Sequence, residues 1–248
     1  MSKGLFITGT DTGVGKTVIA CGIARLFKSR GINVGVMKPI ATGSRHDAIQ
    51  LIKAAGIDET LDVVNPQYFK APLAPTVAAS LERRKVDLDA IYRSYWFLQK
   101  HYDVVIVEGI GGVKVPLGES TYVVDLIQAL RLPALIVGRT TLGTLNHMLL
   151  TFEVLDAAKV PVMGVLLNGG PAFAKATAGQ PALALATAGE HGKTLAEKSN
   201  PDELQDHLRV PVLGVLPQKT AFRKNPSAVA AHLKRLPRFM KEIERAIG

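Results

Sequence analysis

Short apolar runs recur along the 248-residue chain, and longer segments with helical spacing of apolar residues separate them. Most of these runs are continuously apolar and rich in β-branched residues, which is typical of strands buried on both faces of a parallel sheet. The pattern predicts six strands, at residues 5–8, 34–37, 104–107, 134–137, 162–167 and 212–216.

The segments between these runs repeat apolar residues at the spacing of amphipathic helices. Regular alternation of strands and helices predicts an α/β fold, with a doubly wound, mostly parallel sheet flanked by helices. Ligands in such folds bind at the carboxyl ends of the strands. Since no linker divides the sequence, we expect one domain over residues 1–248. The predicted helices lie near residues 15–30, 46–55, 87–100, 123–131, 144–158, 202–208 and 226–246.

Residues 171–192 depart from this alternation. They are rich in Ala, Gly and Thr, and the tetrapeptide Ala-Thr-Ala-Gly occurs at 176–179 and again at 186–189. A pair of copies is too few for a solenoid, which needs about three or more units. We interpret the segment as a low-complexity surface insertion, with a functional lid as the alternative.

Composition narrows the class of protein. Hydrophobic residues make up 47% of the chain, enough for a sizeable core, and the single cysteine, Cys21, fits a reducing compartment. Without an apolar leader or a stretch near the roughly 20 apolar residues that span a bilayer, we expect a cytoplasmic protein with no membrane partner. The formal net charge is +9, but the basic residues near the C-terminus alternate with apolar ones at helical spacing. We interpret them as a solvated helix face and expect no nucleic-acid partner.

A glycine-rich turn joins the first predicted strand to the first predicted helix. It reads Gly-Thr-Asp-Thr-Gly-Val-Gly-Lys-Thr over residues 9–17. Such a turn presents backbone N–H groups to phosphate oxygens, and the helix N-terminus adds partial positive charge. Lys16 is expected to reach the β- and γ-phosphates, and the Thr17 hydroxyl to ligate Mg²⁺. The spacing departs by one residue from Gly-x₄-Gly-Lys-Thr, yet its position indicates a P-loop NTPase rather than a simple tight turn.

Nucleotide binding alone is compatible with several functions. ATPases of plasmid partition and cell-division-site selection carry an extra lysine five residues before the loop lysine, where this chain has Asp11. Cobyrinate-type amidotransferases share the architecture but add a glutaminase domain with a nucleophilic cysteine. Cys21 instead lies among apolar residues of the helix after the phosphate loop, which favours a packing role. The sequence disfavours both classes.

Six segments resemble the dethiobiotin synthetases and occur in that family's order. The phosphate loop is the first. The others are Lys-Pro-Ile-Ala-Thr-Gly at 38–43, Val-Glu-Gly-Ile-Gly-Gly at 107–112, Leu-Gly-Thr-Leu-Asn-His at 142–147, Val-Leu-Leu-Asn at 165–168 and Val-Pro-Val-Leu-Gly-Val-Leu-Pro at 210–217.

The resemblance implies an ATP- and Mg²⁺-dependent cyclo-ligase of biotin biosynthesis. Its substrates are 7,8-diaminopelargonate, CO₂ and ATP, and its products are dethiobiotin, ADP and phosphate. One substrate amine forms a carbamate, whose oxygen attacks the γ-phosphate, and the second amine then displaces phosphate to close a cyclic urea. Phosphoryl transfer of this kind depends mainly on positioning and charge neutralisation.

By the same resemblance, Lys38 stabilises the carbamate and the charge of the transferring phosphoryl group. It follows a predicted strand, so we expect it beside the phosphate loop; a surface lysine is the alternative. Lys16 and Thr12 are the other catalytic candidates. Thr42 is expected to hold the carbamate or the substrate amines, unless it serves only the local turn.

Two carboxylates are candidate magnesium ligands together with Thr17. Glu108 ends the strand at 104–107, and an acidic residue at such a strand end is a common place for a magnesium carboxylate. Asp47 is the family's other metal ligand by resemblance. It could equally be the N-cap of the helix that follows.

The resemblance also implies an adenine site around Asn168, whose amide offers both a donor and an acceptor to the base. The segment around 216–218 is expected to line the same pocket. The complete set of nucleotide-binding candidates is Gly13, Val14, Gly15, Lys16, Thr17, Val18, Asp47, Glu108, Gly111, Asn168, Gly169, Leu216, Pro217 and Gln218.

The helix start formed by Gly143, Thr144, Leu145 and Asn146 has free N–H groups that suit an anion. In the family this helix start comes from the partner subunit and holds the tail carboxylate of the substrate. The resemblance therefore implies a homodimer with active sites at the subunit interface. By residue type alone, Thr144 could simply cap the helix.

Overall fold

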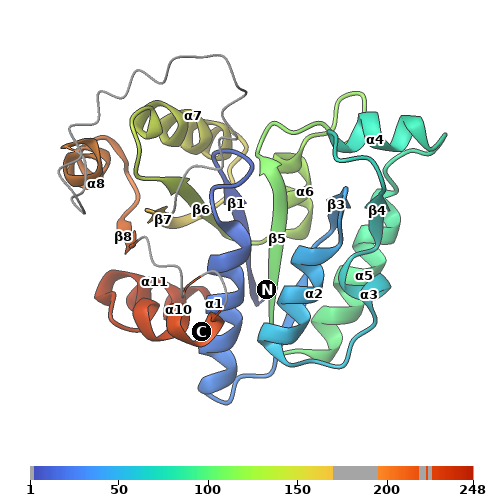
Figure 1. The fold of residues 1–248 in the computed structure, drawn as a ribbon, viewed down its shortest axis with the longest axis horizontal. Coiled ribbons are helices and arrows are strands. Elements are labelled where there is room, and N and C mark those ends of the chain that lie inside the picture. Colours follow the sequence, from blue (N-terminus) through green and yellow to red (C-terminus); the bar gives the residue numbers. More distant parts are fainter. Residues whose placement is uncertain (1–2, 170–194, 218–221, 223–224, 248) are drawn as a thin grey trace.

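The computed structural model describes residues 3–169, 195–217, 222 and 225–247. The predicted insertion at 171–192 lies outside these residues. All six predicted strands form one sheet of order β2-β5-β1-β6-β7-β8, and every neighbouring pair is parallel (Figure 1). The strands are β1 (Gly4–Gly9), β2 (Val34–Met37), β5 (Val104–Gly112), β6 (Ala134–Arg139), β7 (Val162–Asn168) and β8 (Val212–Leu216). The α/β prediction is confirmed.

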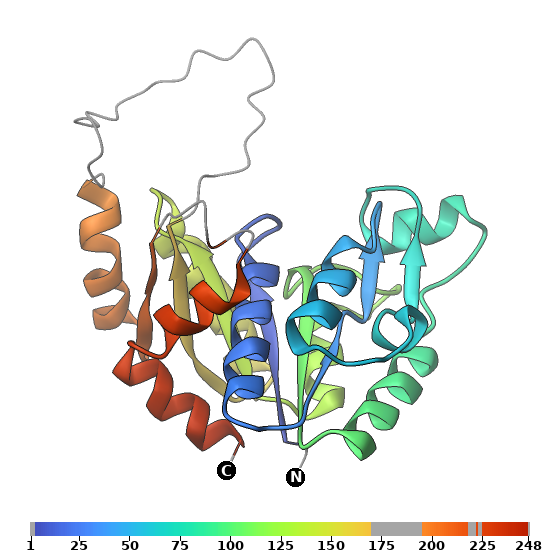
Figure 2. The ribbon, with the colours of Figure 1, turned by 60° about the horizontal axis from the view of Figure 1, so that its bottom comes forward.

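Helices cover both faces of this sheet (Figure 2). Side chains of β1 alternate between the two faces: Leu5 and Ile7 belong to one buried core and Phe6 to the other. This period of two explains why strands covered on both sides are apolar throughout. The helices of the first core are α1 (Lys16–Ser29), α2 (His46–Ala55), α10 (Pro226–Leu233) and α11 (Pro237–Ile247). Those of the second are α5 (Leu88–His101), α6 (Val123–Leu130), α7 (Thr144–Ala157) and α8 (Leu195–His207).

A second, two-stranded parallel sheet of β3 (Ile40–Thr42) and β4 (Gln67–Phe69) follows β2 along the chain. The short helices α3 (Leu61–Val64) and α4 (Pro75–Leu81) belong to the same region. The sequence did not predict these four elements, because such short segments carry too little periodicity to identify.

The predicted single helix at 226–246 is wrong. Helix α10 ends at Leu233, and α11 begins at Pro237. Proline lacks an N–H and is favoured in the first turn of a helix over its interior, which is consistent with a new helix starting there. Both helices still bury apolar residues in the first core, which is why their joint pattern resembled one long helix. The predicted helix at 202–208 is the last part of the longer α8.

The order of the strands determines which residues meet at the phosphate loop. β5 lies between β1 and β2, so Lys38 follows a strand that does not pair with the strand before the loop. Glu108 of β5 lies between them. Parallel strands all end at one edge of the sheet, and the turn after β1 lies at that edge (Figure 2). Among the described helices, none is both long enough and apolar enough to cross a bilayer.

Candidate active site

The turn between β1 and α1 folds closely around its own lysine. Lys16 is the first residue of α1, and its Nζ donates a hydrogen bond of 2.7 Å to the Asp11 carbonyl. Gly15, the residue before the helix, has a φ of 99°. A Cβ at this glycine would be strained by the backbone and would collide with the Asn168 amide. The glycine therefore permits a close approach that other residues would prevent.

Glu108 connects the phosphate loop to the end of β2. Its Oε1 accepts hydrogen bonds of 2.7 Å from Thr17 Oγ1 and 2.7 Å from Lys38 Nζ. The side chain is 1% exposed. Its other oxygen, Oε2, is buried and has no hydrogen-bond partner among the described residues. A buried carboxylate oxygen is normally satisfied, so an unpaired one at this position is suited to a ligand that the chain itself does not supply.

Lys38 is held by two carboxylates. Its Nζ lies 2.9 Å from Asp47 Oδ2 as well as 2.7 Å from Glu108 Oε1, and its side chain is 5% exposed. The alternative of a surface lysine is therefore wrong. The N-cap alternative for Asp47 is also wrong, because α2 begins at His46 with Arg45 as the N-cap residue. Asp47 lies within the first turn and directs its carboxylate at Lys38 instead.

Burial and neighbouring charges shift the titration of these groups. Burial and the positive charge of Lys38 lower the pKa of Lys16 to about 8. Burial alone would lower the pKa of Lys38 as well, but the carboxylates of Glu108 and Asp47 outweigh it and raise that pKa. Burial opposes ionisation of Asp47, yet the ammonium of Lys38 holds the pKa of this carboxyl below its usual range. Lys38 and Asp47 are thus held as an ion pair.

A cavity of about 350 Å³ lies between the phosphate loop and the ends of β2 and β5. It brings together most of the residues that the sequence singled out. Ala41, Ser44 and Ile110 also line it, and the sequence analysis did not single them out. The predicted residues on its wall are Thr12, Gly13, Gly15, Lys16, Thr17, Val18, Lys38, Thr42, Asp47, Glu108 and Gly111.

Comparisons with known proteins identify the family of this chain. The family model of an AAA domain matches residues 3–225. The ATP-dependent dethiobiotin synthetase BioD of Thermodesulfovibrio yellowstonii is 39% identical over 240 residues, which cover 91% of this chain and 92% of that relative. The chain belongs to the dethiobiotin synthetase family. BioD proteins of Bacillus licheniformis (41% over 221 residues, 87% and 86% covered) and Endomicrobium trichonymphae (47% over 173 residues, 68% and 80% covered) are further relatives.

Solved structures of other proteins share the fold of this dethiobiotin synthetase. The septum site-determining protein MinD of Pyrococcus horikoshii, complexed with Mg-ADP, has a TM-score of 0.54 at 16% identity and covers 100% of this chain and 95% of its own. Apo McdA from Cyanthece has a TM-score of 0.59 at 12% identity, with 99% of each chain covered. Identities this low show the P-loop fold alone. The MinD likeness therefore does not support the cell-division class that the sequence disfavoured.

The predicted adenine residues of this dethiobiotin synthetase lie at the ends of β7 and β8. Asn168 Nδ2 donates a 2.9 Å hydrogen bond to the carbonyl of Val14, which connects β7 to the phosphate loop. The N–H of Gly169 donates to the Leu216 carbonyl at 2.8 Å, so the two strand ends lie together. Pro217 follows directly, half-buried, whereas Gln218 lies outside the described residues.

The start of α7 does not reach the cavity of its own chain. None of the described residues that line the cavity comes from Gly143–Asn146. Thr144 is the first helical residue, and its hydroxyl donates a 2.7 Å hydrogen bond to the Arg139 carbonyl, so it is not the N-cap. Arg139 in turn donates from Nη2 to the Thr12 carbonyl at 3.1 Å. Sequence analysis missed Arg139, although a charged residue ending an apolar strand was the signal that identified Glu108.

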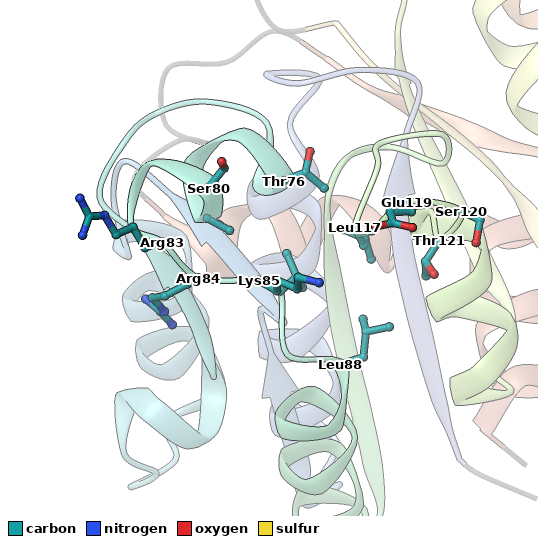
Figure 3. Close-up of a pocket in the computed structure, with 13 residues that line it drawn as sticks. Thr76, Ser80, Arg83, Arg84, Lys85, Leu88, Leu117, Glu119, Ser120 and Thr121 are labelled. Carbon is teal, nitrogen blue, oxygen red and sulfur yellow. The ribbon is translucent and has the colours of Figure 1, made fainter.

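A second cavity of about 980 Å³ lies away from the phosphate loop, between α4 and the segment 117–121 (Figure 3). Arg83, Arg84 and Lys85 are on one side of it and Glu119 is on the other. Arg84 already forms an ion pair of 3.0 Å with Glu82. No described residue of the phosphate loop lines this cavity. The smaller cavity, where the two lysines and two carboxylates meet, is the candidate active site of this dethiobiotin synthetase.

Proposed function

We propose that this member of the dethiobiotin synthetase family carries out ATP-dependent ring closure in the cavity between the phosphate loop and the ends of β2 and β5. 7,8-Diaminopelargonate, CO₂ and ATP enter the reaction, and dethiobiotin, ADP and phosphate leave it. The observation that carries the proposal is the convergence of Lys16, Thr17, Lys38 and Glu108 on one cavity. A triphosphate on the loop would direct its terminal phosphate at the ammonium of Lys38.

The donor set suits Mg²⁺, which prefers oxygen ligands and keeps several of its waters. The Thr17 hydroxyl, which donates a hydrogen bond to Glu108, retains lone pairs for a cation. The unpaired Oε2 of Glu108 and the partly exposed carboxylate of Asp47 are the other two oxygens. These three residues would hold the ion, and the ion would supply neutralisation of phosphate charge.

Lys38 and Lys16 perform different parts of the reaction. Lys16, at the start of α1, neutralises the bound phosphates together with the N–H groups of the loop. Lys38 stabilises negative charge on the carbamate oxygen and on the phosphoryl group that it attacks. Thr42, on the wall of the same cavity, binds the carbamate or the amines, and Thr12, on the same wall, is the third catalytic residue of the proposal. After the second amine attacks the mixed anhydride, phosphate leaves and the cyclic urea is closed.

The adenine site lies at the ends of β7 and β8. Asn168, Gly169, Leu216 and Pro217 form it in this proposal. Support comes from the hydrogen bond between Asn168 and Val14, which brings this region into contact with the phosphate loop. Adenine bound there would lie at the α1 end of the cavity, with its phosphates leading toward Lys38.

The protein acts as a cytoplasmic homodimer in this proposal, with each active site completed by the partner's α7. The start of this helix is exposed: Leu142 is 90% exposed, and Gly143 and Asn146 are also exposed. A large apolar side chain next to a helix N-terminus suits a site that contacts both an apolar tail and its carboxylate. The tail of diaminopelargonate has this chemistry.

A direct assay tests the proposal. The purified chain is incubated with diaminopelargonate, bicarbonate, Mg²⁺ and each of ATP, CTP and GTP, and dethiobiotin is measured by mass spectrometry together with the nucleoside diphosphate. We expect dethiobiotin and ADP in equal amounts, and neither without the diamine. Rapid ATP hydrolysis in the absence of diamine, or its stimulation by DNA or lipid, would indicate a switch ATPase instead.

A further inference from the structure

The peptide unit around Lys38 is fixed by a residue that lies outside the cavity. The N–H of Lys38 donates to the Val64 carbonyl at 2.8 Å, and its carbonyl accepts a 2.7 Å hydrogen bond from Asn65 Nδ2. β2 ends at Met37, so the pairing of that strand with β5 does not hold this peptide. Asn65 is 1% exposed. Its amide is the side-chain group that holds the carbonyl of the lysine.

The other end of the Asn65 amide binds the N-cap residue of α2. Asn65 Oδ1 accepts a 3.0 Å hydrogen bond from Arg45 Nε, and the Arg45 Nη2 donates to the Asn65 carbonyl at 2.6 Å and to the Leu61 carbonyl at 2.8 Å. Arg45 is the N-cap residue of α2, two positions before Asp47. Asp47 in turn pairs with Lys38.

These contacts form a closed ring of four residues. Asn65 is hydrogen-bonded to both Lys38 and Arg45. The backbone connects Arg45 to Asp47, and Asp47 pairs with Lys38. We propose that Asn65 is a positioning residue for phosphoryl transfer, which fixes the backbone of Lys38 and, through Arg45, the start of the helix that carries Asp47. The inference rests on the catalytic role proposed above for Lys38. A misplacement of about 1 Å can slow an enzyme by about 100-fold, so a buried amide at this point affects the rate without touching substrate.

The alternative is that Asn65 only stabilises the turn after α3. A structural role of that kind would lower stability but leave the chemical step unchanged in the enzyme that remains folded. The control is an exposed asparagine at the opposite end of the same strand. Asn33, just before β2, also donates from Nδ2 to a backbone carbonyl, that of His101, at 2.9 Å. It forms no hydrogen bond with Lys38 or Asp47 among the described residues.

The test compares Asn65→Ala, Asn65→Asp and Asn33→Ala by single-turnover rate, KM for ATP and melting temperature. The Asp variant keeps an acceptor for Arg45 but replaces the donor to the Lys38 carbonyl. We expect both Asn65 variants to react about 10- to 100-fold more slowly, with KM for ATP changed by less than about three-fold. Asn33→Ala is expected to melt earlier and react at the normal rate. Equal rates for Asn65→Ala and Asn33→Ala would overturn the proposal.

A double variant separates failure of this inference from failure of the proposed function. In the Lys38→Ala background, Asn65→Ala is expected to cause a smaller loss of rate than in the native protein, because Lys38 is absent and only the placement of Asp47 still depends on Asn65. A further loss by the same factor would show that Asn65 acts independently of Lys38, which contradicts the inference. An unchanged rate in Lys38→Ala alone would remove the lysine from catalysis altogether. If Asn65→Ala does not fold, Arg45→Met is measured against Arg45→Lys, with the slower rate expected for Met.

Discussion

The ammonium of Lys38 lies 2.7 Å from Oε1 of Glu108, and both residues are buried although 70 positions separate them in the chain. Burying two charges costs hydration free energy. Their mutual attraction offsets this cost only when the geometry is favourable. Such a pair is weak evidence for stability. Its position at the ends of β2 and β5, opposite the phosphate loop, instead suits a charge that is needed during the reaction.

Lys38→Ala is expected to lower kcat by about 100-fold or more while ATP affinity changes by less than about ten-fold. The physical reason is that Lys38 faces charge that develops on the transferring phosphoryl group, whereas Lys16 and the loop amides bind the ground-state phosphates. Steady-state kinetics with calorimetric ATP binding measure both effects. Equal losses in kcat and in affinity would place Lys38 in ground-state binding.

Replacing only Lys38 of the buried pair is expected to destabilise the protein more than replacing both Lys38 and Glu108. Lys38→Met leaves a buried carboxylate without its cation and should lower the free energy of unfolding by about 3–5 kcal/mol. Adding Glu108→Leu removes the buried unpaired charge and leaves only the partly exposed carboxylate of Asp47 without its cation, so the double variant should recover much of the loss. Urea unfolding measures all three proteins. The pair of the exposed Arg245 and the partly buried Glu242 is the control, since Arg245→Ala should change stability by about 1 kcal/mol or less.

Gly15→Ala is expected to weaken ATP binding strongly, whereas Gly31→Ala is not. Both glycines have positive φ, 99° and 77°. A methyl group at Gly15 would collide with Asn168, but a Cβ at Gly31 would have nothing within 4 Å. Gly31→Ala should therefore lower the free energy of unfolding by about 1–2 kcal/mol, through backbone strain alone. Unchanged ATP affinity in Gly15→Ala would mean that the loop can rearrange around the added methyl group.

Cys21 is expected to resist alkylation in the native protein even at pH 9. Burial, and next the negative charges of Glu108 and Asp47, raise the pKa of its thiol well above the usual range. The thiolate is the reactive form, so it is populated only when the helix opens. Labelling with iodoacetamide, followed by mass spectrometry with and without urea, tests this. Rapid labelling of the folded protein would show that α1 opens readily or that the thiol is accessible.

Mixing two inactive variants tests the shared active site. In the proposed dimer, Lys38→Ala and Asn146→Ala damage different halves of one site, since Asn146 serves the partner's cavity. Exchange of subunits at equal amounts should place half of the chains in mixed dimers with one intact site each, restoring about a quarter of the wild-type activity. No recovery, with exchange shown by mass spectrometry of tagged subunits, would mean that each site is built from one chain.

The six strands could be predicted from the sequence because a strand buried on both faces must be apolar at every position. The phosphate loop and Glu108 could be located because each follows such a strand, and the role of Lys38 came from the resemblance to the dethiobiotin synthetases. The apolar pattern did not predict β3 and β4, because these strands are too short to show a period. It also did not predict the break at Pro237, because the helices on either side pack into the same apolar core. Local pattern also left open whether Asp47 caps a helix.

Only the tertiary structure decided which strand ends become neighbours. The order β2-β5-β1 places Glu108 between Thr17 and Lys38. It also revealed Asn65 and Arg139, whose hydrogen bonds join segments far apart in the chain. The physical reason is that apolar pattern specifies which face of an element is buried, whereas the pairing of strands and the direction of a polar side chain depend on contacts between residues distant in sequence.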